Sequence, residues 1–424
     1  MAIGTSEIEL PQARPARVAG VREAAGLFVI LSSISFNMLA VVALLPVLSM
    51  IATRFEGDPL AIFLAERFHS NGGQLFAQTL ETMSNIGILV GGPIIGWIAD
   101  RTGRANVLFY SLGVYGVAGA AGLFLDHPPV LLASRLLQGF GSAGIAVTTY
   151  SLVSERFEGA ARSKVMGYQQ VFVSLMGFIA LPLSGHLGER YGWHAPFGLF
   201  LSALIMLPIA LATVPRGGAL APQSSTTLAS TTLASSKGGS IGALTPIYIM
   251  MVPLFIVANM TNLHISFVLA GDGLKGSAAQ SYIMMASPVA YLVGGLLYGW
   301  VTTPLGPRRT LCLILAILAA NGLVIGLAHG ALQTAAGVAL GGFASGFLVP
   351  FTTNLIVNRA APEARARALG FMYMANYIGS FLNPWVTTPI RTWLGNHEIF
   401  LAMGILLAVT ALVQSLTRRS PVNA

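Results

Sequence analysis

The chain repeats itself at an offset of 203 residues, and this repeat constrains its fold more than any other feature. The segment 91–98 (GGPIIGWI) aligns with 294–301 (GGLLYGWV), and the same offset aligns Gly139 with Gly342. Both copies are rich in apolar residues, so each is expected to form a similar bundle of helices. Internal duplication with a binding site between the two copies is typical of membrane transport proteins.

The composition places almost the whole chain in a membrane. Hydrophobic residues make up 54% of the 424 residues and charged residues 9%, whereas soluble domains carry about 25% charged residues. Such a chain cannot cover a water-facing surface, so we expect an all-α membrane protein in a lipid bilayer. The single cysteine, Cys312, excludes an internal disulfide and a metal site built from cysteines. We expect no metal, no cofactor and no enzymatic activity.

Twelve apolar runs divide the chain into two groups of six. A helix needs roughly 20 mostly apolar residues to cross the bilayer. The prediction is twelve transmembrane helices in two pseudo-symmetric six-helix bundles, over residues 25–214 and 244–417. Residues 215–243 are rich in Ser, Thr and Gly, which predicts a flexible cytoplasmic linker. Residues 1–24 and 418–424 are expected to be a cytoplasmic N-terminal segment and a cytoplasmic tail.

The positive charges fall mostly on one side of these runs. Of the 23 Lys and Arg residues, seventeen lie in segments on the side of the N-terminus, five lie in loops on the opposite side, and Arg135 lies within a run. Arg391 is one of the five. Because Lys and Arg concentrate in cytoplasmic loops, both termini are expected to lie in the cytoplasm. The protein itself is expected in the cell membrane, which in a bacterium would be the inner membrane. This topology explains the net charge of +8, so no nucleic acid partner is expected.

A glycine-rich, charged signature follows the second apolar run. Residues 96–104 read Gly-Trp-Ile-Ala-Asp-Arg-Thr-Gly-Arg, and the second copy has Thr303 in place of the aspartate. The segment resembles the loop 2–3 signature of the major facilitator superfamily, in which a glycine precedes an aspartate by four residues and Arg-x-Gly-Arg follows. A helix end with basic anchors is the simpler alternative. The resemblance implies a cytoplasmic gate formed by Gly96, Asp100, Arg101, Gly103, Arg104 and Arg156.

A second signature lies in the fourth run. Leu131 to Ala143 carries Arg135, Gln138 and Gly139 at the spacing of the family signature that contains an intramembrane arginine. Val338 aligns with Arg135 in the second copy, so the duplicated packing does not require the cation. An arginine within a span usually faces a cavity or a carboxylate. The alternative is an arginine that extends to the outer interface.

The fifth run resembles an antiporter signature of the same family, and it directs the prediction toward the drug/metabolite:proton antiporter group. Residues 177–185 read GFIALPLSG. Gly177, Pro182 and Gly185 are expected to bend the helix and allow close packing. Leu181 and His186 stand where the signature has glycines, and small-residue packing by itself could explain the pattern.

A phosphate-binding loop of the Gly-x-x-x-x-Gly-Lys-[Ser/Thr] type does not occur in the sequence, so an ion gradient is the expected energy source. When the acidic residues are assigned to loops and boundaries, Glu81 remains as the candidate intramembrane carboxylate. We hypothesise that Glu81 carries a proton and that Arg135 tunes its acidity. The alternative is a glutamate at the water-facing mouth of the second span.

Polar side chains inside the spans are the candidates for a substrate cavity. Hydrogen bonding between helices is the alternative role for most of them, and for His264 in particular. Little fixed charge is expected in the cavity, which favours neutral or amphipathic substrates, or a weak anion bound by Arg135. The candidates are Asn37, Thr148, Asn259, Asn262, His264, Thr352, Asn354 and Asn376.

Three functions fit these observations. The leading one is proton-coupled export of small amphipathic or drug-like molecules by alternating access. A proton symporter that imports a small organic metabolite is the second, and the antiporter-like fifth run is the feature against it. A membrane sensor of the same fold that does not transport is the third. By family resemblance the protein is expected to be a monomer.

Overall fold

The computed structural model describes residues 20–215, 244–361 and 364–416, and these residues form helices with no β-strand. The predicted linker and the two predicted terminal segments lie almost wholly outside this part of the chain. The predicted all-α membrane fold is confirmed. In the first half the helices are α1 (Val21–Ser33), α2 (Ser35–Val42), α3 (Leu48–Phe55), α4 (Pro59–Phe68), α5 (Gly72–Thr102), α6 (Arg104–Gly119), α7 (Pro128–Arg156), α8 (Gly159–Tyr191) and α9 (Ser202–Thr213). In the second half they are α10 (Thr245–Gly271), α11 (Ser277–Met284), α12 (Ala286–Gly326), α13 (Ala331–Arg359), α14 (Arg365–Leu394) and α15 (Glu398–Leu416).

Ten segments of the described chain are long and apolar enough to cross a membrane. One of them, Ser277–Gly326, is 50 residues long and departs from helical geometry at Gly306, which has a φ of 71°. A segment of that length is long enough for two crossings. The 30-residue helix α14 is not among the ten. The count of twelve spans therefore stays a prediction.

The first span is less regular than the sequence predicts. The chain from Val21 to Phe55 is divided into α1, α2 and α3, with a 3₁₀ turn at Leu45–Val47 that contains Pro46. The additional helix α4 begins where the Asp58 side chain accepts a hydrogen bond from the Leu60 amide at 2.9 Å. This N-cap lies in a segment that the sequence predicted to be a loop.

The repeat recurs in the packing of the two halves. Where α5 crosses α7, a Cβ on Gly139 would clash with the carbonyl oxygen of Ser84. Where α12 crosses α13, a Cβ on Gly342 would clash with the carbonyl oxygen of Ser287 in the same way. Both residue pairs are related by the offset of 203, so the two copies use one helix crossing with a glycine at the point of closest approach.

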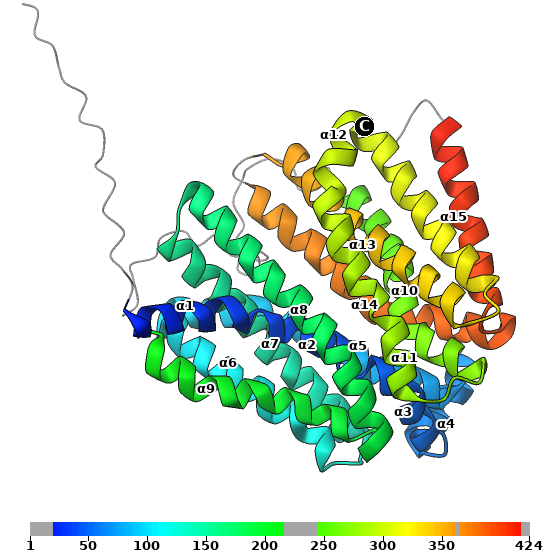
Figure 1. The fold of residues 1–424 in the computed structure, drawn as a ribbon, viewed down its shortest axis with the longest axis horizontal. Helices are drawn as coiled ribbons and strands as arrows, with labels where there is room; N and C mark the ends of the chain where they lie inside the picture. The colour runs from blue at the N-terminus through cyan, green and yellow to red at the C-terminus, as the bar shows by residue number, and fades with distance from the viewer. Residues whose placement is uncertain (1–19, 216–243, 362–363, 417–424) are drawn as a thin grey trace, which may run out of the picture.

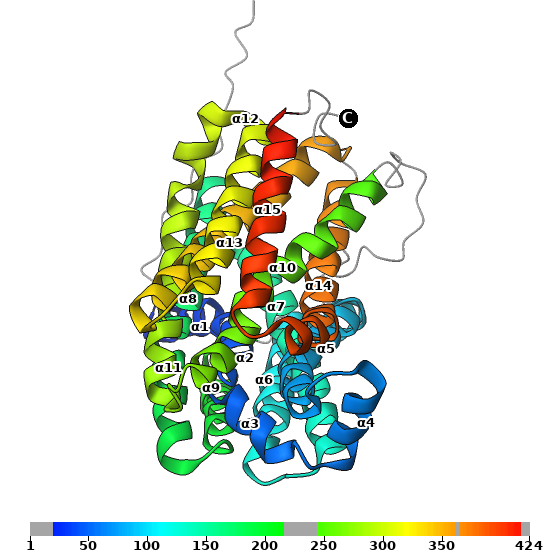
Figure 2. The same ribbon diagram turned by 90° about the vertical axis from the view of Figure 1, so that its right-hand side faces the viewer.

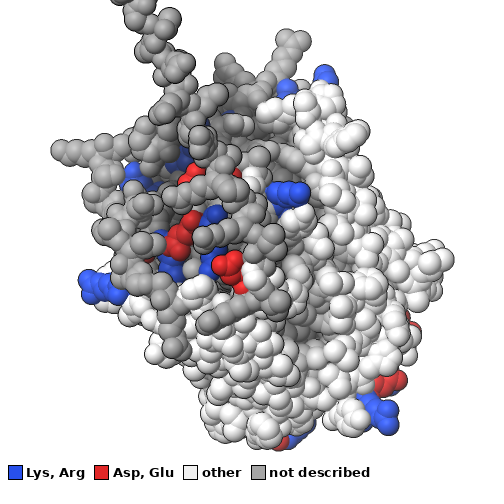
Figure 3. All heavy atoms as spheres, turned by 60° about the vertical axis from the view of Figure 1, so that its left-hand side comes forward, with Lys and Arg blue, Asp and Glu red and all other residues white. Residues whose placement is uncertain are grey.

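The two halves lie side by side, with α14 of the second half against α5 of the first (Figures 1 and 2). Many charged side chains gather toward one end of the molecule, a few more lie at the opposite end, and a broad uncharged surface lies between them (Figure 3). Apolar residues such as Trp300, Ile205 and Leu412 are well exposed on the described surface. A surface of this kind suits the hydrocarbon core of a bilayer.

Candidate functional site

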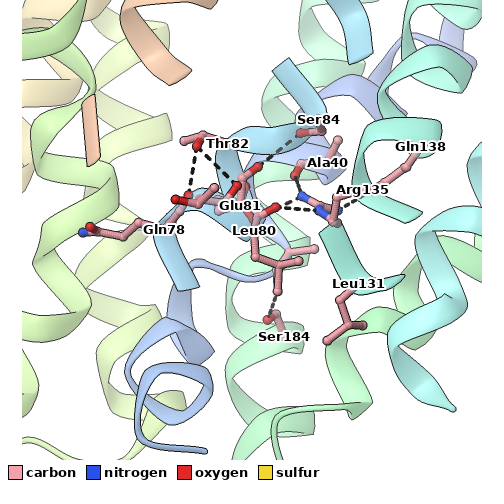
Figure 4. Close-up of polar contacts among 12 residues, drawn as sticks. Ala40, Gln78, Leu80, Glu81, Thr82, Ser84, Leu131, Arg135, Gln138 and Ser184 are labelled. Carbon is pink, nitrogen blue, oxygen red and sulfur yellow. Dashed lines mark hydrogen bonds and ion pairs between the residues drawn. The ribbon is translucent and has the colours of Figure 1, made fainter. Parts of the chain in front are cut away.

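A buried ion pair joins α7 and α5 in the first half. The Arg135 Nη2 atom lies 3.2 Å from Glu81 Oε2, and the two side chains are 0% and 5% exposed (Figure 4). Arg135 also donates to the carbonyl oxygens of Ala40 and Leu80, at 2.9 and 3.3 Å, and to Gln138 Oε1. The guanidinium is therefore surrounded by acceptors from α2, α5 and α7, which compensate part of the cost of burying it.

Gln78 lies one helical turn before Glu81 on α5 and forms hydrogen bonds to the second half. Its Nε2 donates to the Leu263 carbonyl at 2.9 Å and lies 3.2 Å from His264 Nδ1, and its Oε1 accepts a hydrogen bond from Thr388. Both side-chain groups of Gln78 are thus used across the boundary between the halves. His264 Nε2 lies 2.6 Å from Thr387 Oγ1, so a neutral His264 with its proton on Nε2 satisfies all these contacts.

Arg391 lies on the same boundary, and its predicted position in a loop on the outer side is wrong. It belongs to α14, is 2% exposed, and donates to Gln74 Oε1 on α5. Its guanidinium lies 4.6 Å from the centre of the Phe267 ring on α10. Tertiary contacts with both halves bury this charge, and a count of charges between apolar runs cannot detect such contacts. We call Gln74, Gln78, His264, Thr388 and Arg391 the interdomain seal, and the end of the molecule where they lie the sealed end.

The predicted antiporter-like segment of α8 also contacts the second half near this end. The Ser277 hydroxyl at the start of α11 donates to the Gly185 carbonyl at 2.7 Å, and the Ala278 amide donates to Glu189 Oε2 at 3.0 Å. A Cβ on Gly185 would lie 2.6 Å from the Ser277 carbonyl oxygen. Gly185 therefore permits α8 and α11 to approach closely at the boundary.

A cavity of about 260 Å³ lies between the halves. Its lining combines apolar side chains such as Met38, Phe255 and Leu348 with amides and hydroxyls, and none of the described lining residues carries a charge. Three of the eight predicted cavity residues line it, namely Asn259, Asn262 and Asn376. Five polar lining residues were not predicted: Gln170, Ser174, Ser287, Tyr291 and Ser345.

The other five predicted cavity residues lie elsewhere. His264 is fully buried in the interdomain seal, and Thr148 and Thr352 donate to carbonyls of their own helices. Asn37 donates to the Ile34 carbonyl at 3.4 Å, and the exposed Asn354 donates to the Tyr298 hydroxyl at 3.2 Å. Bonds within one helix are the ordinary alternative for such residues.

The predicted gate residues lie at the end of the molecule opposite the seal. Arg104 forms an ion pair with Glu155 at the end of α7, and Arg101 lies 3.8 Å from the centre of the Trp97 ring. Gly103 joins α5 to α6 with a φ of 89°, a conformation that favours glycine. Gly96 is buried, and Asp100 and Arg156 are exposed.

A family model described as the Major Facilitator Superfamily matches residues 25–271 and 238–424. The chain belongs to the Major Facilitator Superfamily. The resemblance inferred from the sequence signatures is thereby confirmed, whereas the antiporter group within the superfamily stays a prediction.

Relatives of this superfamily member include proteins of different function. The Bacillibactin exporter of Bacillus subtilis (strain 168) is 32% identical over 111 residues, which are 25% of this chain and 28% of that protein. This match spans less than a third of that relative's own length. The 3-(3-hydroxy-phenyl)propionate transporter of Escherichia coli (strain K12) is 22% identical over 348 residues, which are 80% of this chain and 84% of that protein.

The structure resembles solved structures of the same fold. The crystal structure of the human organic anion transporter MFSD10 superposes with a TM-score of 0.67 and 18% identity, and the match covers 92% of this chain and 99% of that chain. At this identity the likeness establishes the shared fold.

Proposed function

We propose that the protein is a secondary active transporter that moves small amphipathic organic molecules across a membrane by alternating access. The observation that carries this proposal is an uncharged cavity of about 260 Å³ between two similar halves, beside a seal of hydrogen bonds that joins them. Amides and hydroxyls in an apolar lining suit a solute that has both polar and apolar parts. Both halves of one chain line the cavity, which is compatible with transport by a monomer.

The sealed end would face the outside of the cell and the opposite end the cytoplasm. The sequence supports this orientation, because most Lys and Arg residues fall on the side of the predicted gate. In the alternate state the halves would part at the interdomain seal and close at the cytoplasmic end. Gly96, Asp100, Arg101, Gly103, Arg104 and Arg156 would then form the contacts of the cytoplasmic gate.

Glu81 would be the proton carrier. It is a buried carboxylate with an arginine at 3.2 Å, and protonation would cancel its attraction to Arg135. Its position one turn from Gln78 places it on the helix that holds the interdomain seal, so a change at the ion pair can reach the contacts between the halves through α5. An ion pair that forms and breaks with proton binding can switch a protein between two states.

Export is the direction that we favour. The close contact of Gly185 on α8 with Ser277 of the second half suits the antiporter-like signature, and one relative is the Bacillibactin exporter. The second candidate is import by proton symport. One relative whose match covers 80% of this chain is the 3-(3-hydroxy-phenyl)propionate transporter, which favours a small organic acid as the cargo and leaves this direction open.

The experiment is solute-driven proton movement in proteoliposomes that contain the purified full-length protein. A panel of amphipathic compounds is added, and internal pH is followed with a fluorescent dye. The wild type should move protons with at least one compound, in opposite directions for antiport and symport. Glu81→Gln should abolish the proton movement, whereas the exposed control Glu66→Gln should retain it. Undiminished coupling in Glu81→Gln would remove Glu81 from the mechanism.

A further inference from the structure

Arg391 is a buried cation on the surface where the two halves meet. Its Nη2 donates to Gln74 Oε1 of the first half, and its guanidinium lies beside the Phe267 ring of the second half. The other terminal nitrogen, Nη1, is buried and has no hydrogen-bond partner among the described residues. The side chain therefore has an unused donor inside the protein.

No described carboxylate forms an ion pair with Arg391. Two acidic residues of the second half, one at the end of α10 and one at the start of α15, have other contacts. Asp272 Oδ1 lies 2.7 Å from His397 Nε2, and the Glu398 carboxylate lies against Gly395. Burial of a cation without a counter-ion is costly, so this position favours an incoming anion.

The other buried arginine of the described chain, Arg135, differs because all three of its guanidinium nitrogens have hydrogen-bond acceptors. Arg135 contacts the Glu81 carboxylate, two main-chain carbonyls and the Gln138 side chain. These acceptors occupy both of its terminal nitrogens and its Nε. Arg135 is therefore a poor candidate for binding the acidic group of a substrate, although the sequence suggested it for that role.

Separation of the halves would expose Arg391 together with an apolar surface. Gln74 belongs to the first half and would leave, whereas Phe267 belongs to the same half as Arg391 and would stay. The guanidinium would then present both terminal nitrogens to solution at 4.6 Å from an aromatic ring. A guanidinium fork binds a carboxylate through two parallel hydrogen bonds, and the ring would pack against an apolar body next to that carboxylate.

We propose that Arg391 and Phe267 form a recognition site for the carboxylate of a small amphipathic organic acid, accessible when the halves part at the sealed end. This inference rests on the proposed function, because it requires the halves to part, and it narrows the substrate class to organic monocarboxylates with an apolar or aromatic body. The cavity lining described above carries no charge. The site at Arg391 would therefore select substrates that carry a carboxylate, at the outer opening of the transport pathway.

The test compares two probes of matched shape, 3-phenylpropionate and its neutral amide 3-phenylpropanamide. Binding to the purified full-length protein in lipid nanodiscs is measured by titration calorimetry. The wild type should bind the carboxylate at least tenfold more tightly than the amide. Arg391→Gln should lower the affinity for the carboxylate tenfold or more and change that for the amide less than twofold. The control Arg190→Gln, at an exposed arginine of the sealed end of α8, should behave as the wild type.

Arg391→Lys keeps the charge and removes the fork, so its affinity for the carboxylate should lie between those of the wild type and Arg391→Gln. If Arg391→Gln does not fold, Arg391→Lys decides, and a loss confined to the carboxylate supports the site. Equal affinity of the wild type for both probes, or an unchanged preference in the Arg391 variants, would overturn the inference. Absence of solute-driven proton movement in the wild type would instead contradict the proposed function. The two results can be told apart, because the binding of the probes is measured without proton movement.

Discussion

The Arg135 guanidinium lies 3.2 Å from the Glu81 carboxylate, and both side chains are buried inside the first half of the molecule. Removal of one member of such a pair leaves the other charge without its counter-ion in a medium of low polarity. The cost of this change is typically about 3–5 kcal/mol, whereas neutral replacement of both members is often much less harmful. The pair can therefore be tested for stability separately from transport.

Arg135→Gln should strongly destabilise the protein, because the Glu81 carboxylate remains buried without a cation. Glu81→Gln should also destabilise it, because Arg135 then stays charged and buried without a counter-ion, although the new amide oxygen can still accept a hydrogen bond from Arg135. The double variant Glu81→Gln/Arg135→Gln should be more stable than the sum of the two single losses predicts. Thermal unfolding of the four proteins in detergent micelles measures this coupling. Strictly additive losses would show that the two charges do not stabilise each other.

Gly185→Ala should favour the state that is open at the sealed end. The new methyl group would lie 2.6 Å from the Ser277 carbonyl oxygen, so α8 and α11 must move apart to accommodate it. The readout is the labelling of Ser266→Cys by a membrane-impermeant thiol reagent, in a background where Cys312 is replaced by alanine. Ser266 is fully buried between the halves, with its hydroxyl 3.3 Å from Ser49.

Labelling in Gly185→Ala should be severalfold faster than in the glycine parent. Gly167→Ala is the matched control, because it lies on the same helix and a Cβ there meets no atom within 4 Å. An equal rate in both variants would show that the α8–α11 contact does not hold the sealed end closed.

Gly139→Ala and Gly342→Ala should destabilise the two halves by similar amounts. Each methyl group would clash with a main-chain carbonyl at the equivalent helix crossing, and overpacking of this kind typically costs about 1–3 kcal/mol. Gly295→Ala at the α12–α13 crossing is the control, since its nearest atom would be 3.9 Å away. Melting temperatures of the three variants measure the effect. A large loss in one half and none in the other would argue against the shared crossing.

The fold could be predicted from the sequence because equivalent residues of the two copies lie at a constant offset along the chain. Gly139 and Gly342 are recognisable as equivalent positions, and the same offset relates His194 to His397, each of which has its Nδ1 at 2.8 Å from a carbonyl 72 residues earlier. Apolar run length predicted the helices as well. The helix α4 was missed because its signal is a single N-cap, Asp58, within a polar segment.

The site was harder to predict, because its contacts join residues more than a hundred positions apart. Gln78 makes the contacts with the second half, but a neutral amide in an apolar run is a weaker sequence signal than the Glu81 carboxylate on the same helix. Arg391 directly follows an apolar run in the sequence, a position that predicts a loop. Ser174 and Gln170 line the cavity, whereas the glycine and proline pattern of α8 predicts only close packing of the helix.

A pH-dependent contribution to stability should arise at His397, which precedes α15 outside the membrane-spanning segments. Partial burial lowers the pKa of His397, but hydrogen bonds with Asp272 and the Ile325 carbonyl, and the nearby carboxylates, outweigh this effect and raise the net pKa above 6.5. A raised pKa in the folded state means that the folded protein holds the proton more tightly than the unfolded chain. The contribution is therefore fully present below about pH 6.5, the usual value for histidine, and is lost as pH rises through the folded pKa.

Melting temperatures are measured between about pH 5 and pH 9. As the pH is lowered through this range, the melting temperature of the wild type should fall less than that of Asp272→Asn, because Asp272→Asn lacks the carboxylate that favours the charged imidazole. His397→Gln should behave like Asp272→Asn, because either change removes the protonated pair. The exposed control Glu66→Gln should keep the pH profile of the wild type. If Asp272→Asn retained that profile as well, the His397–Asp272 contact at 2.7 Å would not be coupled to stability. We expect the protonation of His397 to be coupled to stability for a structural reason. The contact with Asp272 joins the loop after α10 to the start of α15, and the hydrogen bond between Nδ1 and the Ile325 carbonyl joins the same imidazole to the end of α12.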